Sequence, residues 1–488
     1  MILGGSLLFN SLEYIFLFVP IVLLVYFFLN KKHLVIGATI WLVITSLFFY
    51  GYLNPSYLLP LILVSISFNF AIGSGLNSLN FKSKISKQTV LLFGIVCNLM
   101  LLGYFKYMDF FINSINSLIH LDLRLLHIVL PLGISFFTFT QIAYLVDSYQ
   151  GKTKEYDFLN YALFVVFFPH LIAGPIIHHS EMMPQFYNLK NKFINWKNLS
   201  EGLFLFLVGL FKKVIIADTL AKWANLGFDS TSQLSSLEAL SSVLSYCFQI
   251  YYDFSGYTDM ALGVAKMFNI DLPQNFNNPY RAIDVQDFWR RWHITLSRFL
   301  RDYVYIPLGG NRKGTARTYI NLMIVFALCG LWHGASWMFV IWGTLHGSAI
   351  VINRLWRKLN INLPIWLSWF ITFAYVNLTW IFFRSENLSI AKNMIKAILG
   401  FNGFAVPKIY GFFIKYSPNI SKIEYWNTVL LFIIPLLILV IFIKFFHEIP
   451  KNLKPNIAYS MLMAILFVIA LFNLLIPEYS SPFIYFNF

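Results

Sequence analysis

The stretch His33–Phe81 reads HLVIGATIWLVITSLFFYGYLNPSYLLPLILVSISFNFAIGSGLNSLNF and contains no Asp, Glu, Lys or Arg. An uncharged apolar run of this length exceeds the roughly 20 residues that one transmembrane helix needs. The segment Gly51–Pro55, GYLNP, is rich in turn-forming residues and divides the run. The stretch therefore predicts two consecutive membrane-spanning helices joined by a short turn.

Lysines on either side of this stretch predict how the spans are oriented. The flanking lysines are Lys31, Lys32, Lys82, Lys84 and Lys87. Two spans return the chain to the same side of the membrane, and loops rich in lysine and arginine stay in the cytoplasm. We therefore expect the N-terminus to be extracytoplasmic. The segment from Glu13 to Lys31 lacks a basic start and a small-residue cleavage site, so we interpret it as a retained first span and not as a removed signal peptide.

The composition of the whole chain agrees with a membrane protein. Of its 488 residues, 58% are hydrophobic and only 12% are charged, with a mean hydropathy of +0.67. Soluble domains carry roughly 25% charged residues. The net charge of +15 comes largely from lysines in short segments between apolar runs, where they meet anionic lipid headgroups. We therefore predict a lipid bilayer as the surrounding partner and no nucleic-acid partner.

Further apolar segments predict the remaining spans. They lie at 87–106, 124–147, 157–181 (interrupted by Pro169, Gly174 and Pro175), 203–216, 243–264, 317–354, 359–383, 426–443 and 457–476. The segments 203–216 and 243–264 are short or polar, and 317–354 holds either one broken helix or two packed ones. We predict an all-α polytopic membrane protein with about 10–13 spans. Residues 1–488 form one domain, because no internal repeat or linker divides them.

The segment Phe288–Ser297, FWRRWHITLS, mixes aromatic residues with arginines around His293. The wider segment Asp284–Tyr305 continues this mixture, which favours an amphipathic or re-entrant helix at the membrane interface. Ionisable groups at membrane depth usually serve a function, so His293 is a candidate site residue. The arginines can hold a phosphate-bearing ligand or can extend to lipid headgroups, and the sequence leaves both interpretations open. The candidate ligand contacts or supporting groups here are Arg290, Arg291, Arg298, Arg301 and Asp302.

A second histidine, His333, lies in Gly330–Gly334, GLWHG, within a charge-free stretch. A neutral imidazole in a poorly hydrated site can take a proton from an alcohol, and we expect Trp332 and Trp337 to form dry walls beside it. The alternative is a structural histidine bonded to a neighbouring helix. His346 follows thirteen residues later, which is about 220° around a continuous helix. It therefore shares a face with His333 only if the helix breaks, and we assign it a supporting position.

A polar island interrupts the apolar segment Tyr251–Gly263, YYDFSGYTDMALG. Asp253 lies within it, and a buried carboxylate needs a partner. We expect Arg281 or Arg290 to fill this role, in either a catalytic or a purely structural ion pair. The loop Gly309–Lys313 is rich in glycine but matches no phosphate-binding loop, so we expect a solvated turn. Cys97, Cys247 and Cys329 are dispersed, and neither they nor the histidines show metal-ligand spacing, so we predict no metal.

Taken together, these motifs resemble the membrane-bound O-acyltransferase superfamily, and specifically its bacterial alginate and peptidoglycan O-acetyltransferase branch. The motifs that carry the resemblance are LGYFKY (102–107), LPLGISF (130–136), FPHLIAGP (168–175), FKKVIIADTL (211–220), YDFSGYTDMA (252–261), NFNNPY (275–280), DFWRRWHITLS (287–297), LRDYVYIPLGGN (300–311) and GLWHGA (330–335). The signature core covers about 130–350.

The resemblance implies a ring of helices around a central funnel, with His333 catalytic and His293 as the second polar group of the active site. It also implies transfer of an acyl group from a thioester, such as acetyl-CoA, to a hydroxyl of an extracytoplasmic polysaccharide. No permanently bound cofactor is expected. The resemblance further implies a separate extracytoplasmic acetyltransferase partner and a location in the cell (inner) membrane. The aromatic tail 483–488, FIYFNF, resembles a terminal motif of this branch. Our hypothesis is that Tyr485 carries the acetyl group, and the alternative is anchoring in the aromatic belt.

Two other functions fit parts of the same pattern. A teichoic-acid D-alanyltransferase would use a similar acyl-transfer site. A polysaccharide or lipid transporter would use His293, His333 and Asp253 as relay or binding groups. The absence of visible inverted repeats in the sequence argues against the transporter.

Overall fold

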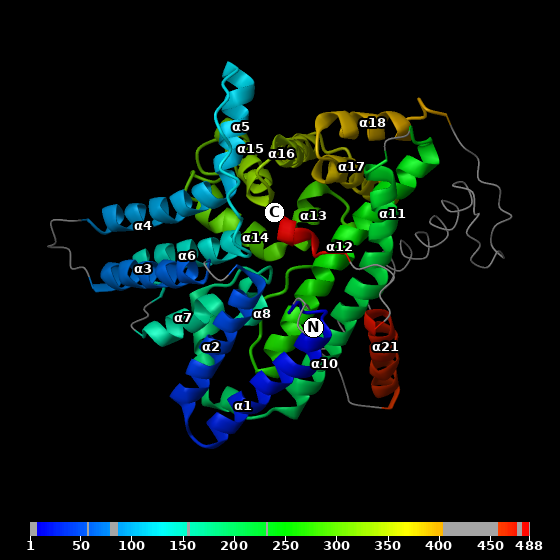
Figure 1. Ribbon diagram of the computed structural model, residues 1–488. Helices are drawn as coiled ribbons and strands as arrows, with labels where there is room; N and C mark the ends of the chain where they lie inside the picture. The colour runs from blue at the N-terminus through cyan, green and yellow to red at the C-terminus, as the bar shows by residue number, and fades with distance from the viewer. Residues whose placement is uncertain are drawn as a thin grey trace.

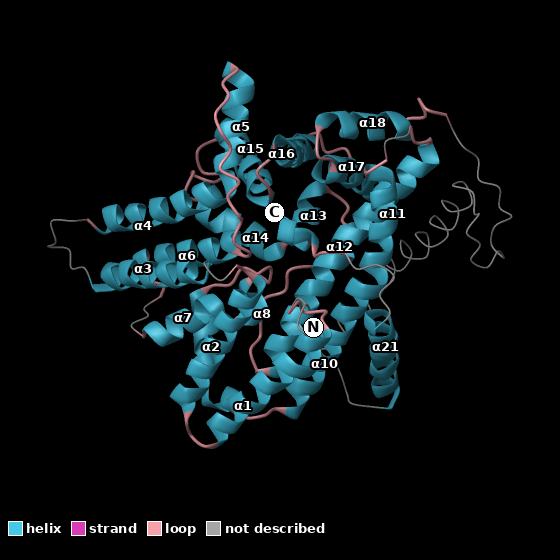
Figure 2. Cartoon of the chain, in the orientation of Figure 1, coloured by secondary structure: helices cyan, strands magenta, loops and turns pink. Residues whose placement is uncertain are grey.

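The computed structural model describes residues 7–55, 58–78, 86–153, 157–230, 233–403, 457–475 and 481–487. Within these ranges the chain forms helices and loops and no strand (Figure 2). Seven helices in the described part are long and apolar enough to cross a bilayer. The prediction of an all-α, multi-pass membrane protein is therefore confirmed. The span expected at 426–443 lies outside the described residues, as do Lys82, Lys84 and Phe488.

The N-terminal half begins with the spans that the sequence predicted. Tyr14–Phe18 is a π-helical start to α1, and the turn at Gly51–Pro55 separates α2 from α3 as expected. The helices of this half are α1 (Val19–Lys31), α2 (Val35–Leu53), α3 (Leu59–Ser78), α4 (Lys87–Leu102), α5 (Met108–Ile119), α6 (Ile134–Tyr149), α7 (Phe158–Val166), α8 (Phe168–Leu171), α9 (His179–Tyr187), α10 (Trp196–Phe211) and α11 (Asp218–Phe228). The π-helical turns Gly103–Tyr107 and Lys212–Ala217 join α4 to α5 and α10 to α11.

The C-terminal half contains the longest helix and the segments that carry the sequence motifs. Its helices are α12 (Ser236–Met267), α13 (Val285–Arg291), α14 (Ile294–Leu300), α15 (Thr315–His333), α16 (Trp337–Lys358), α17 (Ile365–Arg384), α18 (Leu388–Ile398) and α21 (Ile457–Leu475), followed by a 3₁₀ turn at Ile484–Asn487. The segment 317–354 is thus two packed helices. Asp284–Tyr305 is not one helix but α13, α14 and a π-helical turn, Arg301–Tyr305.

Small and polar residues set how closely the helices pack. α10 and α12 cross at two facing glycine pairs, Gly202 with Gly263 and Gly209 with Gly256, where a Cβ would meet backbone of the other helix. Such pairs let helices approach closely in a membrane, where lipid supplies no hydrophobic drive for association. The helices fan outward from a centre where α12, α13 and α14 lie near the C-terminal tail (Figure 1).

Both ends of the described chain pack against α12. Tyr257 of α12 stacks on Phe9 at 4.6 Å between ring centres, and on Phe483 at 4.4 Å. Figure 1 accordingly marks N and C close to α12 near the middle of the view. The tail is therefore part of the core of the protein.

Candidate active site

His293 reaches the centre of the molecule from a strained turn between α13 and α14. Its φ of +44° lies in the left-handed region, which side chains other than glycine seldom adopt. A neighbouring loop holds this turn in place, because Ile294 donates its backbone N–H to the carbonyl of Asn275 at 2.9 Å. The Asn275 side chain contacts His293 Nδ1 at 3.0 Å. Strain of this kind is stored most often at functional sites.

His333 is the last residue of α15, and close packing with α16 fixes its position. Gly330 of α15 and Gly343 of α16 lie against each other, and a Cβ on either would overlap a backbone carbonyl of the other helix. The chain then breaks at Gly334 and turns into α16. Lys106 supports this helix end, because its Nζ donates to the carbonyl of Trp332 at 2.5 Å. The exposed C-terminal carbonyls of a helix need such donors.

Buried charged side chains hold the C-terminal tail so that Tyr485 lies close to His293 and His333. Lys213 Nζ lies 2.8 Å from carboxylate oxygens of both Asp218 and Asp253. It also donates to the Ser481 carbonyl at 2.9 Å. Asp253 accepts the backbone N–H of Ile484 at 2.8 Å. The tail is therefore docked by charge-assisted hydrogen bonds one and four residues before Tyr485.

Three side chains with proton-transfer chemistry, those of Tyr485, His333 and His293, pack together in one buried cluster, which we call the chamber. The ring centre of Tyr485 lies 5.7 Å from that of His333 and 6.2 Å from that of His293, and the two histidine rings are 6.3 Å apart. Each of the three is at most 5% exposed. Three nitrogens have no hydrogen-bond partner within the described ranges: Nδ1 and Nε2 of His333, and Nε2 of His293. Buried polar atoms without a partner are rare in proteins, so these nitrogens are candidates for contact with a bound group.

Burial sets the protonation of two of these groups. It lowers the pKa of His293 to about 3, so this imidazole is neutral at physiological pH. Burial also raises the pKa of the Tyr485 hydroxyl well above its usual range. A tyrosine in this state becomes a nucleophile only if a base takes its proton during the reaction.

Aromatic side chains enclose the chamber, but only one of the two tryptophans expected to do so is among them. Trp332 lies 5.7 Å from His293 and 5.0 Å from His333 between ring centres, so it forms the predicted wall. The same expectation for Trp337 is wrong, because this side chain is 59% exposed and donates to Ser114. The chain turns between α15 and α16, which directs Trp337 away from the chamber. Trp342 takes its place at 5.1 Å from His333.

His346 lies behind this wall, in the supporting position that the sequence suggested. The break at Gly334 reverses the chain, so α16 brings His346 back beside the site. Its ring lies 4.8 Å from that of Trp342, and its two nitrogens contact Trp289 Nε1 at 3.1 Å and Thr379 Oγ1 at 3.0 Å.

The arginines of the motif segment lie apart from the chamber. Arg290 is exposed. Arg291 pairs with Asp287, Arg298 makes a bidentate contact with Glu181 at 2.6 and 3.0 Å, and Arg301 pairs with Asp302. The expectation that Arg281 or Arg290 would pair with Asp253 is wrong. The partner is Lys213, which reaches α12 from the π-helical turn after α10.

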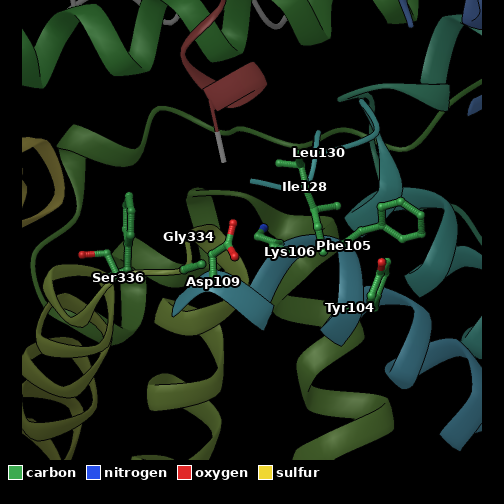
Figure 3. Close-up of a pocket in the computed structure, with 10 residues that line it drawn as sticks. Tyr104, Phe105, Lys106, Asp109, Ile128, Leu130, Gly334 and Ser336 are labelled. Carbon is green, nitrogen blue, oxygen red and sulfur yellow. The ribbon is translucent and has the colours of Figure 1, made fainter. Parts of the chain in front are cut away.

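A pocket of about 280 Å³ lies next to the chamber, beside the residue that follows His333. Gly334, Ser336 and Phe339 line it together with Lys106, Asp109 and Leu130. Figure 3 shows the Lys106 and Asp109 side chains in the space between Gly334 and Ile128. The loop Gly309–Lys313, by contrast, forms a turn whose carbonyl at Gly310 accepts from Asn321.

Four residues of the site were not among the sequence candidates. Lys213, Asp218 and Ser481 hold the tail, and Asn275 holds His293. One signal was present for the lysine: Lys212 and Lys213 interrupt an apolar segment, and charge at such depth needs partners.

Comparison with known proteins places this arrangement in a family. The model of the membrane-bound O-acyltransferase family matches residues 43–391, which include both histidines. The chain belongs to the membrane-bound O-acyltransferase family. It is therefore an acyltransferase, and the resemblance drawn from its motifs is confirmed.

Individual relatives differ in how much of the chain they cover. A peptidoglycan O-acetyltransferase of Helicobacter pylori is 48% identical over 432 residues, which are 82% of this chain and 81% of that protein. A probable alginate O-acetylase of Pseudomonas aeruginosa is 38% identical, over 83% of this chain and 77% of its own length. A teichoic acid D-alanyltransferase of Streptococcus thermophilus is 29% identical over 47% of this chain and 59% of its own.

Proposed function

We propose that the protein is an O-acetyltransferase that moves an acetyl group from a cytoplasmic thioester, acetyl-CoA, to hydroxyls of an extracytoplasmic polysaccharide. The observation that carries this proposal is the meeting of Tyr485, His333 and His293 in one buried chamber. The two relatives named for O-acetylation share about four-fifths of the chain, whereas the one named for D-alanyl transfer shares under half. This difference favours acetyl over D-alanyl, and alginate, peptidoglycan or another exopolysaccharide as the acceptor. Membership of an acyltransferase family argues against the transporter.

In this proposal His333 is the general base of a two-step transfer. In the first step it takes the proton of the Tyr485 hydroxyl, and the oxygen attacks the thioester carbonyl carbon. The new C–O bond forms, the C–S bond breaks, and His333 returns the proton to the sulfur, so that free thiol leaves. In the second step a hydroxyl of the acceptor, presented by the extracytoplasmic acetyltransferase partner, gives its proton to His333 and attacks the acetyl-tyrosine. The ester bond to Tyr485 then breaks, and the phenol is restored.

The burial of the chamber suits this chemistry. Water would hydrolyse both the thioester and the tyrosine ester, and an enclosed apolar site keeps it away. Trp332 and Trp342 pack against the His333 ring, and Phe254 lies 3.9 Å from the Tyr485 ring. The tail contacts described above hold the hydroxyl near the base, which reduces the entropy cost of the first step.

The cellular setting follows the same proposal. The protein lies in the cell (inner) membrane, with its N-terminus extracytoplasmic. The acetyl group enters from the cytoplasmic side and leaves toward the cell wall. A separate extracytoplasmic acetyltransferase takes it from there to the polymer.

Replacement of Tyr485 by Phe tests the carrier step. Phe preserves the stacking on Phe254 and removes the hydroxyl that would form the ester. We expect ester-linked acetate on the polymer to fall to background at equal membrane expression, and an acetylated tail peptide to be detected by mass spectrometry only in the wild type. Full polymer acetylation by Tyr485→Phe would show that the tail does not carry the acetyl group.

A further inference from the structure

The hydrogen bonds around Asn275 settle which nitrogen of His293 carries the proton. Asn275 Oδ1 lies 3.3 Å from the backbone N of Thr295, which can only donate. It also accepts from Thr295 Oγ1 at 2.9 Å, and that hydroxyl in turn accepts the backbone N–H of Ile176 at 3.0 Å. The amide atom that faces His293 is therefore the oxygen, and it needs a donor. His293 Nδ1, at 3.0 Å, must carry the hydrogen.

A neutral imidazole has one N–H, so this bond leaves a lone pair on His293 Nε2. That atom is buried and has no partner among the described residues. His333 lies across the chamber with its ring centre 6.3 Å away. A hydrogen bond between the two rings requires them to come closer than this, and catalytic hydrogen bonds are often long before substrate binds.

We propose that Asn275 is a positioning residue that holds His293 as an acceptor for the N–H of His333, and thereby fixes which nitrogen of His333 is the base. This inference rests on the proposed role of His333. The chain of contacts runs from Asn275 to His293, from His293 to His333, and from His333 to the incoming hydroxyl. It follows the general logic in which a catalytic base is oriented by a third group. When His333 takes a proton, its imidazolium N–H donates to Nε2 of His293, and this hydrogen bond stabilises the positive charge.

The other charged and titratable groups around His293 do not disturb this arrangement. Tyr485 faces it from the tail and His333 from α15. Asp253 of α12 forms an ion pair with Lys213. Lys106 donates a hydrogen bond to the carbonyl of Trp332. Of the arginines in its own segment, Arg290 is exposed, and Arg291 and Arg298 are half-buried in ion pairs.

Asn275→Asp is a close test because the replacement has the same shape. Asn275 Nδ2 has no hydrogen-bond partner within the described part of the chain, so its exchange for oxygen removes no contact. The new carboxylate keeps the bonds to Thr295 and to His293 Nδ1. It also raises the pKa of His293, because an opposite charge stabilises the imidazolium. Below that raised pKa, Nε2 carries a hydrogen and no longer accepts from His333.

The readout is the pH dependence of kcat for acyl transfer by the full-length protein in proteoliposomes, between about pH 5 and pH 9. Burial places the pKa of His293 at about 3 in the wild type, so its Nε2 stays unprotonated throughout this range. We expect Asn275→Asp to lose about tenfold or more of its kcat at the acid end and to recover as the pH rises. Thr295→Val is the control. It disturbs the same polar cluster without adding charge and should keep the wild-type pH profile.

An Asn275→Asp profile parallel to that of the wild type, at the same height or lower, would overturn the proposal. A purely structural asparagine lowers activity equally at every pH. If the wild type transfers an acyl group other than acetyl, the proposed donor is wrong, and the profile is measured with the group that it does transfer. The two failures are therefore distinguishable.

A measurement on the wild type covers the case in which Asn275→Asp does not fold. ¹⁵N NMR of histidine-labelled protein distinguishes the two neutral tautomers of an imidazole, and His293→Gln identifies the signal of interest. We expect Nδ1 of His293 to be protonated and Nε2 to be unprotonated at neutral pH. A proton on Nε2 would contradict the proposal.

Discussion

Replacement of Asp253 by Asn tests whether the buried charges position the tail for catalysis. The aspartate contacts Lys213 through one oxygen and the backbone N–H of Ile484 through the other, both at 2.8 Å. Asn has only one side-chain oxygen and can accept from only one of these donors. Its NH₂ group then faces the other donor, and that hydrogen bond is lost. Lys213 keeps Asp218 as its counter-charge, so the variant does not leave the buried lysine without a partner.

The expected magnitude follows from the lost contact. A hydrogen bond to a charged group contributes about 1.5–3 kcal/mol, and about 1.4 kcal/mol corresponds to a factor of ten. The docked position of the tail should therefore become about tenfold to a hundredfold less favourable. Because Tyr485 lies near His333 only when the tail is docked, acyl transfer should fall within that range.

The assay measures polymer-bound acetate in cells and acyl transfer by isolated membranes, at matched expression. Asp229→Asn is the matched control, since Asp229 pairs with Arg384 near the surface, where such ion pairs contribute about 0–1 kcal/mol. Less than a twofold effect is expected there. Full activity of Asp253→Asn at equal expression would refute the idea that this carboxylate positions the tail.

Two other contacts around His333 lead to predictions of the same kind. Gly330→Ala places a Cβ against the carbonyl of Phe339 and should force α15 and α16 apart, which costs about 1–3 kcal/mol of folding free energy. We expect a lower melting temperature and a loss of acyl transfer. The control variant Leu331→Ala should not show this loss. Lys106→Met removes the donors to the Trp332 carbonyl and to Ser135 Oγ. It should destabilise the end of α15 by about 1–3 kcal/mol, seen as a lower melting temperature together with reduced kcat, and unchanged values of both would contradict the role given to this lysine.

Hydrophobic patterning predicted the long apolar helices of the described residues and their order, because hydrophobicity is a local property of the chain. The turn at Gly51–Pro55 separates α2 from α3 as expected, and the interruption near Pro169 appears as the short helices α7 and α8. The prediction of a span at 124–147 was less accurate, because α6 begins only at Ile134. Gly133, with a φ of +75°, precedes it and ends the extended stretch before the helix.

Long-range pairing was beyond the reach of the sequence. The sequence identified His293 and His333 as candidates from the residues around them, and it added Tyr485 through the resemblance of its aromatic tail to the family. It could not show that Lys213, forty residues before Asp253 in the chain, is the partner of that aspartate. Nor could it show that the turn after His333 removes Trp337 from the chamber and supplies Trp342 in its place.

The most direct test of the central claim compares wild type with His333→Ala at equal membrane expression. The quantity measured is ester-linked acetate released separately from isolated cell-wall and exopolysaccharide fractions. If the chamber around His333 transfers acetyl groups, acetate disappears from one fraction, and that fraction identifies the class of polymer. Unchanged acetate in every fraction would contradict the account.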